Sequence, residues 1–239
     1  MDISVVVPVY GCPDALVPLH TRLTETLIQL TSSYEIILVN DGCPRGSWDV
    51  IKKICEKDNK VVGVNLSRNF GQLHSTNAGI NMAKGDYVVL IDCDLQDRPE
   101  GIIDLYSEIN KGYDIVIVKR TNRKENKITL ALSDMFYKIY NYFVDGYYDG
   151  SIGNFCMVRK KIVDEYNKIR DNNKSFTTTL CWMGYKTSYI ELESDNRYLN
   201  RCFLKRQLFS RCYFGVDDEY CRKPTMMIKI SYVHLPICI

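Results

Sequence analysis

Three carboxylates follow an apolar run near the middle of the chain. Tyr87 to Ile91 is followed within six residues by Asp92, Asp94 and Asp97. Clustered like charges repel, so a positive partner is expected there. In an extended segment residues two apart point the same way, which would place Asp92, Asp94 and Gln96 on one face. Two carboxylates and an amide oxygen suit Mg²⁺ or Mn²⁺, whose remaining ligands are often waters and substrate phosphates.

The alternative is a solvated acidic turn that leads into a helix near Pro99. The placement of the acids decides between the two readings, because ligands of open α/β sheets bind beyond the carboxyl ends of the strands. The acids stand at such an end, and we therefore favour a cation site.

The elements that must position these acids are short β-branched runs alternating with helical patterns. Leucines at three- and four-residue spacing between residues 16 and 30 predict one helical face. Further helices are expected around residues 49–54, 72–83, 130–143 and 160–169. The expected strands cover residues 3–7, 35–39, 61–66, 87–91, 114–118 and 155–158.

Helix-length connections between buried strands imply right-handed crossovers. The sequence therefore predicts an α/β fold with a Rossmann-like, open, mostly parallel sheet and helices on both faces. Two further strand ends would then meet the acids at one crevice, namely the segments that carry Pro8 with Tyr10 and Asp41 with Gly42.

Composition excludes some classes of protein and leaves others open. The net charge of +2 over 239 residues gives no reason to expect nucleic acid. No apolar run reaches the roughly 18 residues of a membrane-spanning helix. Ten cysteines without a CxxC pair favour a reduced, cytoplasmic setting. No GxGxxG follows a strand, which argues against a dinucleotide oxidoreductase.

The sequence contains, in this order, the segments VVVPVYG, LVNDG, SRNFGQ, NAG and DCDLQDRPE. Together these five segments resemble the family-2 glycosyltransferases. The most similar branch contains dolichyl- and polyprenyl-phosphate sugar synthases together with bacterial capsule and O-antigen transferases. The resemblance covers roughly residues 1–200 and implies a GT-A fold and inverting transfer from a nucleotide-diphosphate sugar.

The resemblance also implies roles for residues at the strand ends. Pro8 and Tyr10 would frame the nucleotide base, Asp41 would hydrogen-bond it, and Arg68 would lie near the nucleotide. On residue type alone, Asp41 with Gly42 reads equally well as a turn.

For the acidic segment, the resemblance implies that Asp92 serves the ribose or the metal. Asp94 and Gln96 would hold the metal on the diphosphate. Breaking the anomeric C–O bond expels a diphosphate of growing negative charge, which a divalent ion and nearby cations stabilise. Asp94 is thus a catalytic candidate. Arg120 is another, since it opens a basic run (residues 119–127) beyond a strand end, although such runs are usually solvated.

The acceptor side departs from the family pattern. Polyprenyl-phosphate enzymes have an acid and an arginine where this chain has Asn154 and Cys156. An asparagine cannot act as a base, which favours a glycan acceptor and leaves Asp149 or Asp145 as the candidate base. Arg197 matches a family arginine that would contact substrate, but the loop expected after it is missing.

The sequence therefore predicts a transferase domain at residues 1–200 and a divergent, or frame-shifted, tail at 201–239. We expect hexose transfer to a lipid-linked glycan during surface polysaccharide synthesis. The alternatives are a polyprenyl-phosphate hexose synthase and a nucleotide-sugar-binding protein that no longer turns over. A cytoplasmic location is expected, together with peripheral contact to the inner membrane face through the aromatic residues 136–148.

Overall fold

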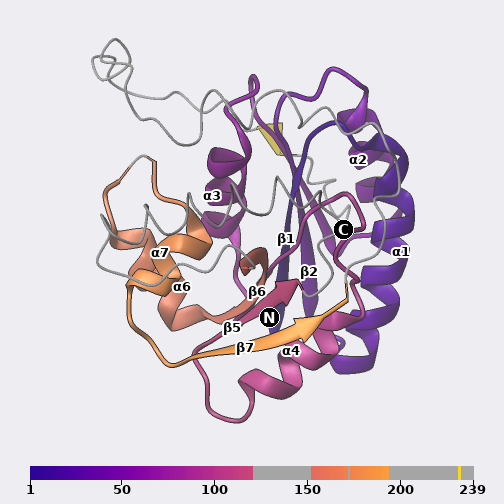
Figure 1. Ribbon diagram of the computed structural model, residues 1–239. Coiled ribbons are helices and arrows are strands. Elements are labelled where there is room, and N and C mark those ends of the chain that lie inside the picture. Colours follow the sequence, from indigo (N-terminus) through magenta and orange to yellow (C-terminus); the bar gives the residue numbers. More distant parts are fainter. Residues whose placement is uncertain (121–151, 172, 194–230, 233–239) are drawn as a thin grey trace, which may run out of the picture.

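The computed structural model describes residues 1–120, 152–171, 173–193 and 231–232. Strands and helices alternate through the first of these ranges, as the sequence predicts (Figure 1). The elements are β1 (Ile3–Val9), α1 (Pro13–Leu30), β2 (Tyr34–Asn40), α2 (Ser47–Lys57), β3 (Val61–Asn65), α3 (Gln72–Met82), β4 (Tyr87–Leu90), α4 (Gly101–Ile109), β5 (Ile115–Arg120), β6 (Ile152–Arg159), α6 (Lys160–Lys168), α7 (Phe176–Trp182), β7 (Thr187–Leu192) and β8 (Ser231–Tyr232).

The described strands form one open sheet in the order β7-β5-β6-β4-β1-β2-β3-β8. Its centre, β3-β2-β1-β4, is parallel throughout, which confirms the predicted fold class. β1 lies in the middle, and all seven of its residues are buried. A strand that is covered on both faces is continuously apolar instead of alternating, and Val5-Val6-Val7 shows this pattern.

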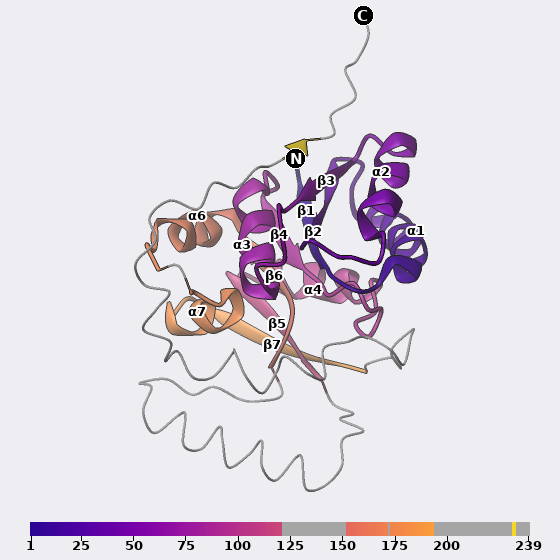
Figure 2. The same ribbon diagram turned by 90° about the horizontal axis from the view of Figure 1, so that it is seen from above.

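Helices cover the two faces of the sheet and enclose two cores (Figures 1 and 2). Helices α1, α2 and α4 pack on one face, where Leu19, Ile51 and Leu105 are fully buried. Helices α3, α6 and α7 pack on the other, where Ile80 and Tyr166 are fully buried. Because helices cover both faces of the sheet, the loops at the ends of the strands stay accessible, and the predicted site residues lie at these strand ends.

Strand β6 runs antiparallel to both of its neighbours, β4 and β5. Two reversals restore the direction, so β5 points the same way as β4, and its parallel partner β7 does as well. The carboxyl end of β5 and the amino end of β6 therefore lie at the same edge as the carboxyl ends of β1, β2 and β4. The sequence gives no sign of this reversal.

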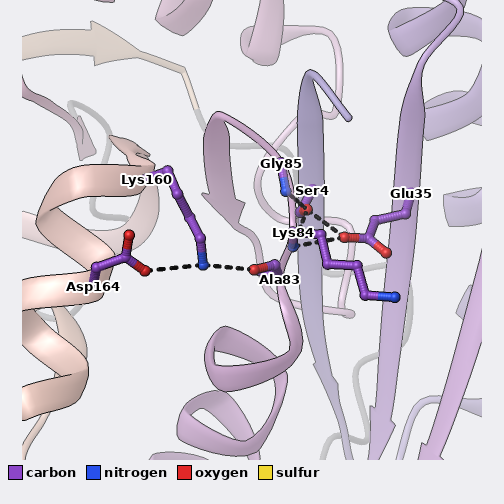
Figure 3. Close-up of polar contacts among 7 residues, drawn as sticks. All are labelled: Ser4, Glu35, Ala83, Lys84, Gly85, Lys160 and Asp164. Carbon is purple, nitrogen blue, oxygen red and sulfur yellow. Dashed lines mark hydrogen bonds and ion pairs between the residues drawn. The ribbon is translucent and has the colours of Figure 1, made fainter.

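The opposite edge is held by a buried polar cluster (Figure 3). Ser4 Oγ donates to Glu35 Oε1 at 2.6 Å, which links β1 to β2. The backbone N–H groups of Lys84 and Gly85 both donate to Ser4 Oγ, at 3.1 and 2.7 Å. A Cβ on Gly85 would lie 2.5 Å from the Ser4 backbone nitrogen, so glycine is required where α3 turns into β4.

A second attachment near this edge comes from α6. Its first residue, Lys160, donates from Nζ to the carbonyl oxygen of Ala83 at 2.9 Å and pairs with Asp164 at 3.2 Å (Figure 3). Both clusters hold the ends of elements at the edge opposite the acidic turn. The edge formed by the carboxyl ends of the strands, where the predicted site lies, is not used by these structural contacts.

Most of the predicted tail, and the boundary predicted near residue 200, lie outside the described residues. Within the tail only Ser231 and Tyr232 are described, and they pair antiparallel with β3. The division into two parts stays a prediction. Among the helices that the structure describes, none combines the length and apolarity that crossing a bilayer requires.

Candidate functional site

The carboxyl ends of β1, β2 and β4 lie next to one another. Val9 pairs with Asn40, and Val6 pairs with Leu90. The segments that follow these strands therefore emerge at one edge. The strand ends that precede Tyr10, Asp41 and Asp92 thus converge as predicted, and a ligand shared by these side chains stays a prediction.

The acidic segment after β4 alternates in exposure. Asp92, Asp94 and Gln96 are half-buried, whereas Cys93, Leu95 and Asp97 are 7%, 4% and 3% exposed. Exposure alternates as that division requires, and a shared face for Asp92, Asp94 and Gln96 stays a prediction. The prediction that this segment has an extended backbone is wrong, because Leu95 has a φ of 58° and the Gln96 N–H donates to Asp94 Oδ1 at 3.1 Å. The chain turns here, so that Asp94 closes an Asx turn.

Asp41, just beyond β2, organises the loop after β3. Its Oδ1 accepts the Phe70 N–H at 2.8 Å, and its Oδ2 accepts the Gly71 N–H at 3.0 Å. Burial raises the pKa of this carboxyl, and the two backbone donors act against that rise. Sequence reasoning assigned Asp41 to the nucleotide base, and contact with a base stays a prediction. What the structure adds is a positioning role.

Gly42 lets this loop approach so closely. It has a φ of 58°, and a Cβ here would overlap the carbonyl carbon of Arg68 and lie 2.5 Å from the backbone nitrogen of Asn69. Glycine is therefore required both for the left-handed backbone and for space. The Asp-Gly pair at 41–42 is more than a generic turn, because it positions the loop of residues 67–71.

Pro8 is buried inside β1, and Tyr10 is half-buried just beyond the strand. The Ile91 N–H donates to the Val6 carbonyl and the Asp41 N–H donates to the Val9 carbonyl. The backbone groups of successive β1 residues therefore point alternately to β4 and to β2. Position 8 points to β4, but it lies beyond the last β1 residue that pairs with β4, so the N–H that proline lacks is not needed there. A proline is accommodated in a central strand here because the ladder has already ended.

Arg68 is exposed in the loop after β3, with its guanidinium carbon 4.3 Å from the centre of the Phe70 ring. His74, in the first turn of α3, meets the same ring edge-on. Burial lowers the pKa of His74, nearby Asp41 acts against this and Arg68 acts with it. The predicted position of Arg68 near the strand ends is thus consistent with the fold, and its contact with nucleotide stays a prediction.

Asn154 and Cys156 lie two residues apart on β6 but in different environments. Asn154 Nδ2 donates to Asp92 Oδ1 at 3.4 Å, a long hydrogen bond. Cys156 pairs with Leu90 in the sheet and is fully buried. At position 156 this chain therefore has a core residue, with no exposed side chain that could contact a phosphate.

Of the remaining predicted site residues, only Arg120 lies within the described part of the chain. Arg120 ends β5 at the carboxyl edge, opposite Leu192, and its side chain is not described. Its neighbour Lys119 lies over the Tyr189 ring at 4.6 Å. Asp149 and Arg197 lie outside the described residues, as do Asp145 and the aromatic segment 136–148.

Gln72 is a site residue that sequence reasoning did not single out. It is the first residue of α3, and its Nε2 donates to Asp92 Oδ1 at 2.8 Å. The only signal in the sequence was its place at the end of the SRNFGQ segment. Nothing there indicated that it reaches a carboxylate twenty residues further on.

The carboxylate oxygens of Asp92 and Asp94 suit a hard cation whose other coordination positions are filled by a bound ligand. Within the described part of the chain, no three His, Cys, Asp or Glu side chains are grouped so as to hold a metal by themselves. Asp92 and Asp94 supply two half-buried carboxylates. Mg²⁺ commonly binds through one or two carboxylates together with substrate phosphates, so this set fits a metal that arrives with a diphosphate.

The open, mostly parallel sheet with helices on both faces has the GT-A fold. The family model described as glycosyl transferase family 2 matches residues 4–187, so this chain belongs to that family.

Known proteins agree with this assignment. An uncharacterized glycosyltransferase of Synechocystis is 32% identical over 199 residues, covering 83% of this chain and 63% of that protein. A prophage bactoprenol glucosyl transferase homologue of Escherichia coli K12 is 30% identical over 193 residues, covering 80% and 63%. The chain thus spans less than two thirds of the length of these relatives.

Among solved structures, a mannosyltransferase of Pyrobaculum calidifontis in complex with GDP-Man and Mn²⁺ has a TM-score of 0.55. The match covers 83% of this chain and 57% of that one, at 13% sequence identity. This likeness supports the fold.

Proposed function

We propose that this protein transfers a hexose from a nucleotide-diphosphate sugar to a polyprenyl phosphate, with inversion at the anomeric carbon and with Mg²⁺ or Mn²⁺. The observation that carries the proposal is the half-buried pair Asp92 and Asp94 at the carboxyl end of β4, in a chain of family 2. Such a pair matches a cation that binds a diphosphate.

In the proposed reaction the acceptor oxygen attacks the anomeric carbon from the face opposite the diphosphate. The anomeric C–O bond breaks, and the nucleoside diphosphate leaves with the bonding electrons. The bound metal would stabilise the charge of that leaving group. The chain's own contribution is to orient the donor: Asp92 and Asp94 hold the diphosphate side, while Pro8, Tyr10 and Arg68 line the nucleotide side. Arg120, at the carboxyl end of β5, would supply a further cation.

A phosphate acceptor differs from the glycan favoured on sequence grounds, and two observations support the change. The relative from E. coli is named for bactoprenol, a polyprenyl carrier. Cys156 is a core residue, so the absence of an arginine there says little about the acceptor. A phosphate monoester is ionised near neutral pH, with a second pKa of about 6, and therefore needs no base. This removes the difficulty that Asn154 cannot take a proton.

The first experiment is ligand screening by thermal denaturation. UDP-, GDP- and dTDP-sugars are added with Mn²⁺, with Mg²⁺ and with excess chelator, because a ligand that binds the native state raises the midpoint. One donor should stabilise the protein only when metal is present. Stabilisation by no donor under any condition would sink the proposal.

The second experiment identifies the acceptor. The stabilising donor, labelled in its sugar, is offered with undecaprenyl phosphate or with a lipid-linked glycan, and the product's anomeric configuration is read by NMR. We expect an inverted phosphodiester product. If only the glycan is a substrate, the sequence-based alternative holds, and Asp149→Asn should then abolish turnover because a hydroxyl acceptor needs a base. Donor binding without any transfer would favour the inactive alternative.

The cellular setting follows from the acceptor. A polyprenyl phosphate lies in a membrane and the donor is water-soluble, so we propose that the protein works at the cytoplasmic face of the inner membrane in surface polysaccharide synthesis. Co-sedimentation of the protein with vesicles that contain undecaprenyl phosphate would test this.

A further inference from the structure

Two side-chain amides converge on one oxygen of Asp92. Gln72 Nε2 donates to Asp92 Oδ1 at 2.8 Å, and Asn154 Nδ2 donates to the same atom at 3.4 Å. The donors come from different elements, the start of α3 and the strand β6, which neighbours β4 in the sheet. The register explains the second contact: Leu90 pairs with Cys156, so two residues further along Asp92 lies across from Asn154.

These bonds extend the contacts of Asp41. That carboxylate holds the N–H groups of Phe70 and Gly71, and Gly71 immediately precedes Gln72. The start of α3 is thereby fixed from β2, while the side chain of its first residue reaches the acid after β4. The ends of β2, β4 and β6 are joined through Asp41, Gly71, Gln72, Asp92 and Asn154.

These hydrogen bonds constrain the side chain of Asp92. This half-buried carboxylate stands two residues from Asp94, and like charges favour rotamers that separate them. The 2.8 Å bond from Gln72 is exposed to solvent, where such a bond orients the carboxylate and adds little net stability to the fold. An amide adds no charge, so it fixes the carboxylate without neutralising it. A lysine at position 72 would instead compete with a cation.

We propose that Gln72 is a positioning residue that acts on the donor diphosphate only through Asp92, with Asn154 as a weaker second support. The inference rests on the proposed function and deepens it, because it says how the acidic turn is kept ready for a metal. Groups that orient metal ligands in this way typically change metal affinity by about 10- to 100-fold when they are lost.

The test compares Gln72→Leu with Gln29→Leu. Leucine removes the amide at similar size, and Gln29 is an exposed glutamine of α1 that bonds only locally, to the Glu25 carbonyl, among its described contacts. The probe is whichever of UDP-glucose, GDP-mannose or dTDP-glucose stabilises the wild type with Mn²⁺. Affinity is measured by calorimetry with Mn²⁺ and with chelator.

We expect Gln72→Leu to weaken probe binding at least about tenfold with Mn²⁺ and to leave the weaker metal-free binding unchanged. Its unfolding midpoint without ligand should match that of Gln29→Leu. A purely structural role for Gln72 would lower that midpoint and affect both binding conditions. Binding by Gln72→Leu that equals the wild type would overturn the inference and leave the proposed function intact.

A double-mutant cycle isolates the route through Asp92. In an Asp92→Ala background, Gln72→Leu should cause no further loss of Mn²⁺-dependent binding, because residues that act through each other are not additive. An equal loss in both backgrounds would mean that Gln72 contacts the ligand directly, against the inference. A wild type that binds no probe would overturn both the proposed function and this inference.

Discussion

The close approach at Gly42 gives a quantitative prediction. Replacing Gly42 by alanine imposes two costs: a left-handed backbone, about 1–2 kcal/mol for a residue with a Cβ, and an overlap with the backbone of Arg68 and Asn69, for which overpacking values of about 1–3 kcal/mol apply. The sum, about 2–5 kcal/mol, is a large share of an ordinary domain stability of about 5–15 kcal/mol.

Gly46→Ala is the matched control. Gly46 has a φ of 77°, and the nearest atom to its Cβ would be Asp49 Oδ2 at 4.0 Å, so only the backbone cost applies. Urea unfolding followed by tryptophan fluorescence should show Gly42→Ala to be less stable than Gly46→Ala. The former should also lose nucleotide-sugar binding, since its clash displaces the loop held by Asp41. Equal stability and equal binding of the two variants would refute this reasoning.

Three further predictions concern single side chains. Asp94→Ala should abolish transfer and the metal-dependent part of donor binding; unchanged activity, or full wild-type activity in excess chelator, would contradict the assignment. Burial lowers the pKa of His74, so below about pH 6.5 the unfolded chain takes up a proton that the folded protein resists. The wild type should therefore lose stability as pH falls from 7 to 5, and His74→Gln should lose less in thermal melts; parallel profiles would contradict a lowered pKa at His74. Tyr166→Phe removes the hydroxyl that donates to Asn77 Oδ1 at 2.6 Å, and should lower the urea-derived stability by about 1–3 kcal/mol, whereas an unchanged midpoint would show that the bond contributes little.

Much of the fold follows from local patterns. The β-branched runs of β1, β2 and β3 and the leucine spacing of α1 are signals of period and burial, which a sequence carries directly. The edge at which Asp41 and Asp92 meet then follows from the parallel order of strands. These features depend on which residues are apolar and how far apart they stand.

The direction of β6 could not be predicted in this way. Its apolar run, Phe155 to Val158, would be equally buried whichever way it ran. Only the pairing of Leu90 with Cys156 brings Asn154 to Asp92 and makes Cys156 a core residue. Sequence reasoning therefore read both positions as acceptor residues, when one is described in contact with the acidic turn and the other is interior.

Side-chain contacts between segments that are distant in the sequence could not be predicted either. Asp41 was assigned to the nucleotide base, which stays a prediction, and its side-chain bonds to the Phe70 and Gly71 N–H groups were not predicted. Gln72 was assigned no role. A carboxylate has the same appearance in a sequence whether it binds substrate or shapes a loop. Separating the two requires knowing which backbone N–H groups lie within reach.

The reversal at β6 has a consequence for how such enzymes can diversify. The chain leaves the sheet at Arg120 and re-enters it at Ile152, and both points stand at the same rim as Asp92. A graft that replaces residues 121–151 between these two points should therefore leave the register of the described strands unchanged. Chimeras with other family members, grafted at these two points, would test whether the exchanged stretch selects the acceptor.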